Sequence, residues 1–149
     1  MTEKIVPDII GAQDLCEFDR DVTVFEAAKM MADRRVGAVV ITRNGRLEGI
    51  VTERDLAVRV IAQGKNPNTT KLGEVMTKNP VVLAPHESPE AALERMRAGD
   101  FRHLPVVDGT RVIGVIAIRD LYAVVKGQLE DDIKTREAFI FGNGHGGLS

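Results

Sequence analysis

The segment 49–55, which reads GIVTERD, carries the residues best suited to bind a phosphorylated ligand. Thr52 directly precedes a predicted helix, and the free N–H groups and dipole of a helix N-terminus attract phosphate. Asp55, one turn later, offers two carboxylate oxygens that can accept hydrogen bonds from the two hydroxyls of a ribose. Gly49 allows a ligand to approach the backbone closely, and Arg54 can balance phosphate charge. These residue types at this spacing indicate a site for a phosphorylated ribose.

A second copy of this pattern lies 65 positions later in the chain, without a gap. It ends in Arg119 and Asp120, and Ala117 stands where the first copy has a threonine. The Thr-x-x-Asp spacing is also that of a capping box, which needs no ligand. Because Ala117 has no hydroxyl, we expect Asp120 not to form half of such a box. The Arg-Asp pair is present in the second copy although the threonine hydroxyl is absent, which favours ligand binding. An aspartate in a first helical turn is, however, stabilising by itself.

Arg102 and His103 precede a predicted strand, at the position where the first copy has Gly37 and Ala38. A neutral histidine can donate one hydrogen bond to a phosphate, and a protonated one adds a charge. The alternative is a solvated arginine beside a half-buried histidine with no ligand. The sequence does not show which way the two side chains point, so they can reinforce either copy of the site.

Each copy predicts the same elements around these residues: a helix, two strands joined by a tight turn, and a closing helix. Thr23 and Ser88 are the expected N-caps, and the second helix is expected to end before Gly99. Asn-Gly and Asp-Gly pairs predict the two hairpin turns. The expected strands are 38–42, 46–51, 104–107 and 111–116. They are almost continuously apolar, so both faces of the sheet must be covered, and the helices are the elements available.

The segments outside the hairpins are less regular. Residues 64–70 form the expected linker, followed by a short amphipathic stretch and an extended lead-in at 81–84. The equivalent lead-in of the first copy is expected at 6–10. Residues 129–141 predict a charged helix that ends in an apolar cluster, and the Gly-rich end at 142–149 predicts a mobile tail.

Composition excludes several classes of protein. The 149 residues carry a net charge of −2 and 4% aromatic residues, which argues against nucleic acid as a partner. No run of 18 apolar residues exists, and residues 1–13 lack a long apolar core, so neither a membrane span nor a secretory signal is expected. The single Cys16 cannot form an internal disulfide, which favours a reducing cytoplasm. The spacing of His, Cys, Asp and Glu predicts no metal site.

Four motifs in this order resemble the CBS domain, named for cystathionine β-synthase. They are the lead-in EVMTKNPVVL, the helix EAALERM, the strand entry RHLPVVD and the close GxxxxRDL. Two such domains in tandem form a Bateman module. The resemblance implies an α+β fold in which two β-α-β-β-α units pack sheet to sheet about a pseudo-twofold axis, with a cleft between them. We expect repeats at 1–65 and 66–128, followed by the C-terminal helix and tail at 129–149.

The resemblance also implies that the chain binds an adenosine nucleotide (AMP, ADP, ATP or NAD(H)) and acts as a regulatory module for energy or redox sensing. The implied binding residues are Gly49, Thr52, Arg54, Asp55, Arg102, His103, Arg119 and Asp120. No nucleophile–base pair or close carboxylate pair indicates an enzyme. The alternative is a purely structural dimerisation module with a vestigial cleft.

Two partners are expected besides the nucleotide. Apolar helical residues at Met30, Met31 and Met96 have no obvious partner within one chain, which predicts a homodimer. A signalling module without a catalytic domain would act on a separate effector protein.

Overall fold

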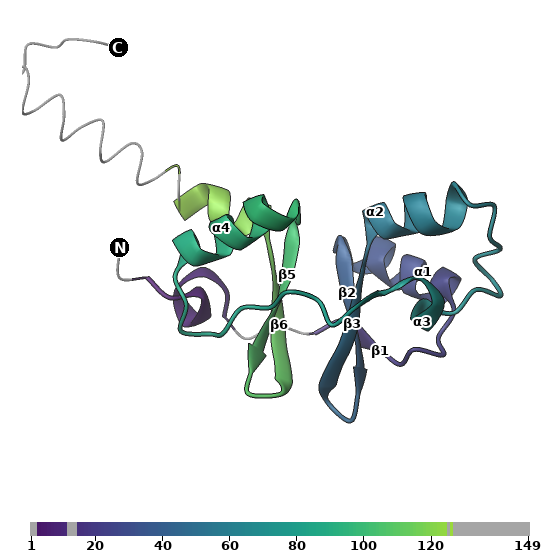
Figure 1. Ribbon diagram of the computed structural model, residues 1–149, viewed down its shortest axis with the longest axis horizontal. Coiled ribbons are helices and arrows are strands. Elements are labelled where there is room, and N and C mark those ends of the chain that lie inside the picture. Colours follow the sequence, from purple (N-terminus) through teal and green to yellow (C-terminus); the bar gives the residue numbers. More distant parts are fainter. Residues whose placement is uncertain (1–2, 12–14, 125, 127–149) are drawn as a thin grey trace, which may run out of the picture.

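The structure is a computed structural model that describes residues 3–11, 15–124 and 126 (Figure 1). The predicted helix and tail at 129–149 lie outside the described residues. The turn η1 (Ile5–Ile9) precedes the first unit. That unit consists of β1 (Glu17–Phe18), α1 (Val24–Arg34), β2 (Ala38–Arg43), β3 (Arg46–Thr52), α2 (Glu53–Asp55) and η2 (Leu56–Ile61). α3 (Leu72–Val75) and β4 (Thr77–Lys78) follow in the chain and pack on this first unit. The second unit consists of α4 (Pro89–Gly99), β5 (His103–Asp108), β6 (Arg111–Ala117) and a helix at 118–124.

The two hairpins confirm the predicted repeat. In the first, β2 and β3 pair antiparallel from Ala38↔Thr52 onward, and in the second His103↔Ala117 is the matching pair, 65 positions later. Figure 1 shows the hairpins side by side in the middle of the molecule, with helices on their outer sides. They meet in one six-stranded sheet of order β1-β2-β3-β6-β5, with β4 added beside β3. The mixed α+β fold is therefore the expected one.

The two units join where Arg46 pairs with Arg111 across β3 and β6. These residues are equivalent under the repeat, so the pseudo-twofold axis passes between them. No other pair of residues links β3 to β6 in the ladder. The other end of each hairpin, where β3 or β6 leads into its closing helix, therefore lies away from this contact.

Helix α4 ends one residue later than expected, because Gly99 is its last residue. Asp100 takes the left-handed conformation that closes the helix, with φ of 57°, as Arg35 does after α1 with φ of 55°. A Cβ on Gly99 would lie 2.1 Å from the Phe101 ring. The glycine is thus explained by close packing against Phe101 and does not mark the end of the helix.

The lead-in of the first unit is β1, so the expectation that residues 6–10 fill this role was wrong. Phe18 pairs with Ile41 just as Leu83 pairs with Val106, again 65 positions apart. The segment around η1 instead packs on the second unit. Ile5 is fully buried in the second hydrophobic core, and its N–H donates to Glu87 O at 2.8 Å.

Each unit has its own hydrophobic core, with Met31 in the first and Met96 in the second. The two methionines are 5% and 1% exposed, so the expectation that they lack partners within the chain was wrong. They face the apolar side of their own sheet. Other large apolar side chains are exposed on the helices: Phe25, Val58, Ile61 and Tyr122. Within the described residues, no helix is long and apolar enough to cross a bilayer.

Candidate functional site

A cavity of about 590 Å³ lies between the two units and brings together five of the predicted residues. The first unit contributes Thr52, Arg54 and Asp55, and the second contributes Arg102 and His103. Its apolar wall is formed by Ile50, Pro80, Val81, Phe101 and Leu104. We call it the Asp55 cavity. The sequence left open which way Arg102 and His103 point, and the structure places them opposite Asp55.

Thr52 and Asp55 also form a complete capping box. Thr52 Oγ1 accepts a hydrogen bond from Asp55 N at 3.2 Å, and Asp55 Oδ2 accepts one from Thr52 N at 2.9 Å. Asp55 Oδ1 lies 3.7 Å from Arg59 Nε. Because each carboxylate oxygen can accept two hydrogen bonds, Asp55 retains capacity for a ligand hydroxyl. The box therefore holds the carboxylate in place beside the cavity.

Asp120 forms half of such a box, contrary to the prediction. Its Oδ2 accepts a hydrogen bond from Ala117 N at 2.8 Å. This bond uses the backbone N–H of Ala117, so the missing hydroxyl does not prevent it. The persistence of Asp120 is thus explained by helix capping and no longer favours a ligand. The case for a ligand rests on the cavities.

A second cavity of about 300 Å³ is the counterpart of the Asp55 cavity under the repeat. It contains Ala117, Arg119 and Asp120 at the positions of Thr52, Arg54 and Asp55. Leu15 and Cys16 replace Pro80 and Val81, and Gly37 and Ala38 replace Arg102 and His103. We call it the Asp120 cavity. It lacks the threonine hydroxyl and Arg102, whereas His103 lines it as well.

His103 lines both cavities. Burial lowers the pKa of its imidazole below the usual 6.5, and the positive charges of Arg119 and Arg102 act in the same direction. Glu53 and Asp120 oppose this effect and raise the pKa. The lowered pKa favours the neutral imidazole, in which one nitrogen donates and one accepts.

Gly37 and Glu53 belong to the site although the sequence analysis did not select them. A Cβ on Gly37 would lie 2.9 Å from His103 Nε2, so the glycine makes room for the imidazole. The repeat held a signal for this, since Gly37 is the counterpart of Arg102. Glu53 lines the Asp55 cavity and a third cavity of about 680 Å³.

The third cavity lies between α1, the start of the first closing helix and the helix at 118–124. Three arginines line it, Arg35, Arg102 and Arg119, with Glu53 as the only carboxylate. It shares Glu53, Arg102 and His103 with the Asp55 cavity. The charge at this junction is therefore positive and suits an anion.

Arg54 lies at the mouth of the Asp55 cavity, where its Nη1 is 3.7 Å from Asp100 Oδ2. Both side chains are highly exposed, so this ion pair between the units adds little stability. Arg54 remains accessible to a ligand phosphate.

Gly49 lines none of these three cavities. A Cβ there would lie 2.6 Å from Met76 Sδ and 2.8 Å from Thr77 O. Gly49 therefore makes room for the side chain of Met76 and the backbone of Thr77, where β4 pairs with β3. The expected contact between Gly49 and a ligand stays a prediction, and packing of Met76 against the strand already accounts for the glycine.

No group of three or more His, Cys, Asp and Glu side chains that could hold a metal ion occurs among the described residues. The polar lining of the Asp55 cavity instead combines three carboxylates and two threonine hydroxyls with three arginines and one imidazole. This set fits a ribose and phosphate better than a metal ion.

The family model of the CBS domain matches the chain twice, at residues 9–61 and 72–127. The chain belongs to the CBS-domain family. It is 46% identical over 97 residues to the CBS domain-containing protein CBSCBSPB2 of Arabidopsis thaliana, covering 64% of this chain and 18% of that protein. It is 38% identical over 99 residues to the CBS domain-containing protein YhcV of Bacillus subtilis, covering 66% and 70%. The chain thus spans less than a fifth of the plant relative.

Solved structures of tandem CBS domains share the fold. A CBS-domain protein from Agrobacterium tumefaciens is 35% identical, with a TM-score of 0.73 over 80% of this chain and 98% of that one. A CBS-domain protein from Pyrobaculum aerophilum, solved in complex with AMP, is 28% identical, with a TM-score of 0.67 over 72% and 83%. The CBS pair of protein MJ0100, solved with 5'-methylthioadenosine and S-adenosyl-L-methionine, is 25% identical, with a TM-score of 0.71 over 78% and 92%.

Proposed function

We propose that this chain is a regulatory module that binds an adenosine nucleotide in the Asp55 cavity and has no catalytic activity of its own. One observation carries the proposal: the two units supply complementary groups to a single cavity of about 590 Å³. Asp55 and Arg54 come from the first unit, and Arg102 and His103 come from the second. The volume lies within the range of about 300–1,000 Å³ typical of small-molecule sites.

Each group has a distinct role in this proposal. Asp55 accepts hydrogen bonds from the ribose hydroxyls, and the capping box holds it in position. Arg102 and Arg54 balance the phosphate charge, and His103 donates its one N–H to a phosphate oxygen. The base lies against Pro80 and Val81, which are apolar and discriminate between bases poorly.

The relatives support an adenosine ligand. Two solved structures at 28% and 25% identity contain AMP, and 5'-methylthioadenosine with S-adenosyl-L-methionine, respectively. These ligands share an adenosine and differ in what is attached to the ribose. The adenosine part is therefore the common element that we transfer to this chain, with AMP, ADP, ATP and NAD(H) as candidates.

Thermal unfolding tests the proposal directly. A ligand that binds only the folded state raises stability by about 2.7 kcal/mol at one hundred times its dissociation constant. We expect AMP, ADP, ATP or NAD(H) at millimolar concentration to raise the melting midpoint by several degrees. If none does, the nucleotide function fails and the structural dimerisation module becomes the better account. Mass spectrometry of small molecules released from the purified protein identifies the natural ligand.

We also propose that the chain forms a homodimer and regulates a separate effector protein in the cytoplasm. The dimer is supported by the exposed apolar side chains on three helical segments, including Phe25, Ile61 and Tyr122. Ile61 is 68% exposed, which is unusual for an isoleucine and typical of a contact surface. The cytoplasmic location rests on the single Cys16 alone.

A further inference from the structure

We infer that Arg95 and Glu87 are positioning residues for the ligand of the Asp55 cavity, because their ion pair fixes the chain segment that carries Pro80 and Val81. The inference rests on the proposed function. Neither residue touches the cavity itself. Both act through the backbone of residues 82–84, directly after the apolar wall.

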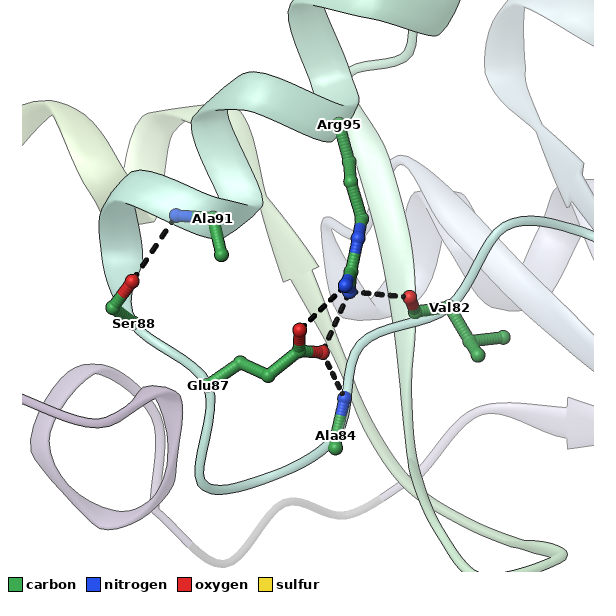
Figure 2. A network of polar contacts seen from close by, with 6 residues as sticks. All are labelled: Val82, Ala84, Glu87, Ser88, Ala91 and Arg95. Carbon is green, nitrogen blue, oxygen red and sulfur yellow. Dashed lines mark hydrogen bonds and ion pairs between the residues drawn. The ribbon is translucent and has the colours of Figure 1, made fainter.

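Figure 2 shows the contacts that this ion pair makes. Arg95 of α4 meets both carboxylate oxygens of Glu87, with Nη1 at 2.6 Å from Oε2. The same Nη1 donates to Val82 O at 2.9 Å, and Glu87 Oε2 accepts from Ala84 N at 2.7 Å. The helix thus holds the lead-in at two residues, on either side of Leu83.

The lead-in is held from its other side by strand β5. Leu83 N donates to Pro105 O at 2.9 Å, and Val107 N donates to Leu83 O at 2.8 Å. Leu83 is fully buried, whereas Val81 is 43% exposed and lines the cavity. The carbonyl of Val82 is therefore the last anchored group before the cavity wall, and Arg95 sets its direction. Bidentate arginine pairs fix geometry in this way.

In the first unit, apolar residues occupy the positions equivalent to this ion pair. The counterparts of Glu87 and Arg95, 65 positions earlier, are Val22 and Met30. Val22 packs against the first hydrophobic core. The fold of a unit therefore does not require an ion pair at this place. The ion pair accompanies the wall of the larger cavity, which has the fuller set of ligand groups.

The desolvation cost of this ion pair agrees with a positioning role for Arg95 and Glu87. The two side chains are 37% and 22% exposed, so pairing them costs desolvation that an apolar pair would avoid. Such a pair is weak evidence for stability, which leaves orientation of the bound segment as the role inferred for it. The exposed pair of Arg97 with Glu94 on the same helix joins residues three apart and holds no other segment.

The test compares three variants with the wild type by calorimetric titration with AMP and with ATP. The double variant Glu87→Val with Arg95→Met copies the apolar pair of the first unit. Arg95→Met alone leaves the half-buried carboxylate of Glu87 without its main partner and is expected to melt at lower temperature. Arg97→Met is the matched control on the same helix. All proteins carry Asp120→Ala, so that only the Asp55 cavity is titrated.

We expect the double variant to melt close to the wild type but to bind about tenfold more weakly, as for one lost positioning hydrogen bond. Arg97→Met should bind like the wild type. Wild-type affinity in the double variant overturns the inference, and so does loss of its fold, because the pair would then be structural. If the wild-type protein binds neither AMP nor ATP, the titration is repeated with ADP and NAD(H), and failure of all four overturns the proposed function itself.

Discussion

At the scale of single residues, the two copies of the ligand-binding pattern have become unequal. Both carboxylates accept a hydrogen bond from the backbone at the start of their helix, so Asp55 and Asp120 are held alike. The difference lies in what surrounds them. Thr52 and Arg102 line the cavity beside Asp55, whereas Ala117 and Gly37 stand at the equivalent positions beside Asp120, and His103 lines both cavities.

Replacing each aspartate tests this inequality. We expect Asp55→Asn to remove most measurable nucleotide binding, and Asp120→Asn to affect a weaker phase or nothing. Asparagine keeps an oxygen that can accept the capping hydrogen bond, so helix stability is largely retained. Losing a hydrogen bond to a charged group costs about 1.5–3 kcal/mol, roughly ten- to a hundredfold in affinity. Isothermal titration of both variants provides the comparison, and equal losses would contradict the proposed order.

Gly37 offers a second test, because its role depends on space and not on charge. A methyl group at this position would lie 2.9 Å from His103 Nε2 and 3.3 Å from Glu53 Oε1. We expect Gly37→Ala to displace the imidazole and weaken nucleotide binding about tenfold, as for one lost hydrogen bond. Gly11→Ala is the control, since nothing lies within 4 Å of a Cβ there. Both variants are measured by titration, and equal affinities would show that His103 is not a ligand group.

At the scale of the elements, the repeat predicted the hairpins and their caps well, because these depend on short local patterns. Thr23 and Ser88 cap α1 and α4 as expected, accepting from Glu26 N and Ala91 N. Strand β1 was missed because two residues leave no periodicity. The burial of Ile5 in the second core is a contact between distant parts of the chain, for which the sequence holds no local signal.

The directions of Arg102 and His103 could not be predicted for a similar reason. They depend on how the two units meet at Arg46 and Arg111, and that contact has no motif of its own. The packing of Met76 against Gly49 could not be predicted, because a glycine that admits a ligand and one that admits a methionine side chain look identical in sequence. The sequence therefore predicted which kinds of residue line the site, but it did not predict what each of them contacts in space.

The ion pair between Arg95 and Glu87 predicts how the stability of the fold depends on pH. Arg95 holds the pKa of Glu87 below the usual 4.5, mainly through their side-chain hydrogen bonds. A carboxyl whose pKa is lowered by folding stabilises the protein above the unfolded-state pKa, and this contribution disappears as pH falls through the folded-state pKa. We therefore expect stability to fall below pH 4.5 by less in Glu87→Val/Arg95→Met than in the wild type. Denaturant unfolding between pH 6 and pH 3 measures the difference, and parallel curves would contradict it.

At the scale of the whole molecule, apolar surface predicts self-association. We expect light scattering at micromolar concentration to give twice the chain mass of 16.3 kDa. The double variant Ile61→Ser with Tyr122→Ser should shift the protein toward the monomer without loss of fold, because both side chains are more than half exposed. Val112→Ser, which alters a buried position, should instead reduce stability. A wild-type mass of one chain would contradict the dimer.

His103 has a consequence for how the two cavities can fill. A neutral imidazole has one N–H, and this histidine borders both the Asp55 cavity and the Asp120 cavity. A ligand that accepts that hydrogen bond in one cavity leaves only an acceptor nitrogen to the other, where a second anion would be repelled. If both cavities bind a nucleotide, we therefore expect the two sites to be coupled negatively, and by thermodynamic reciprocity each ligand should weaken the other by the same factor. A chain built from two similar halves would then bind its first ligand more tightly than its second.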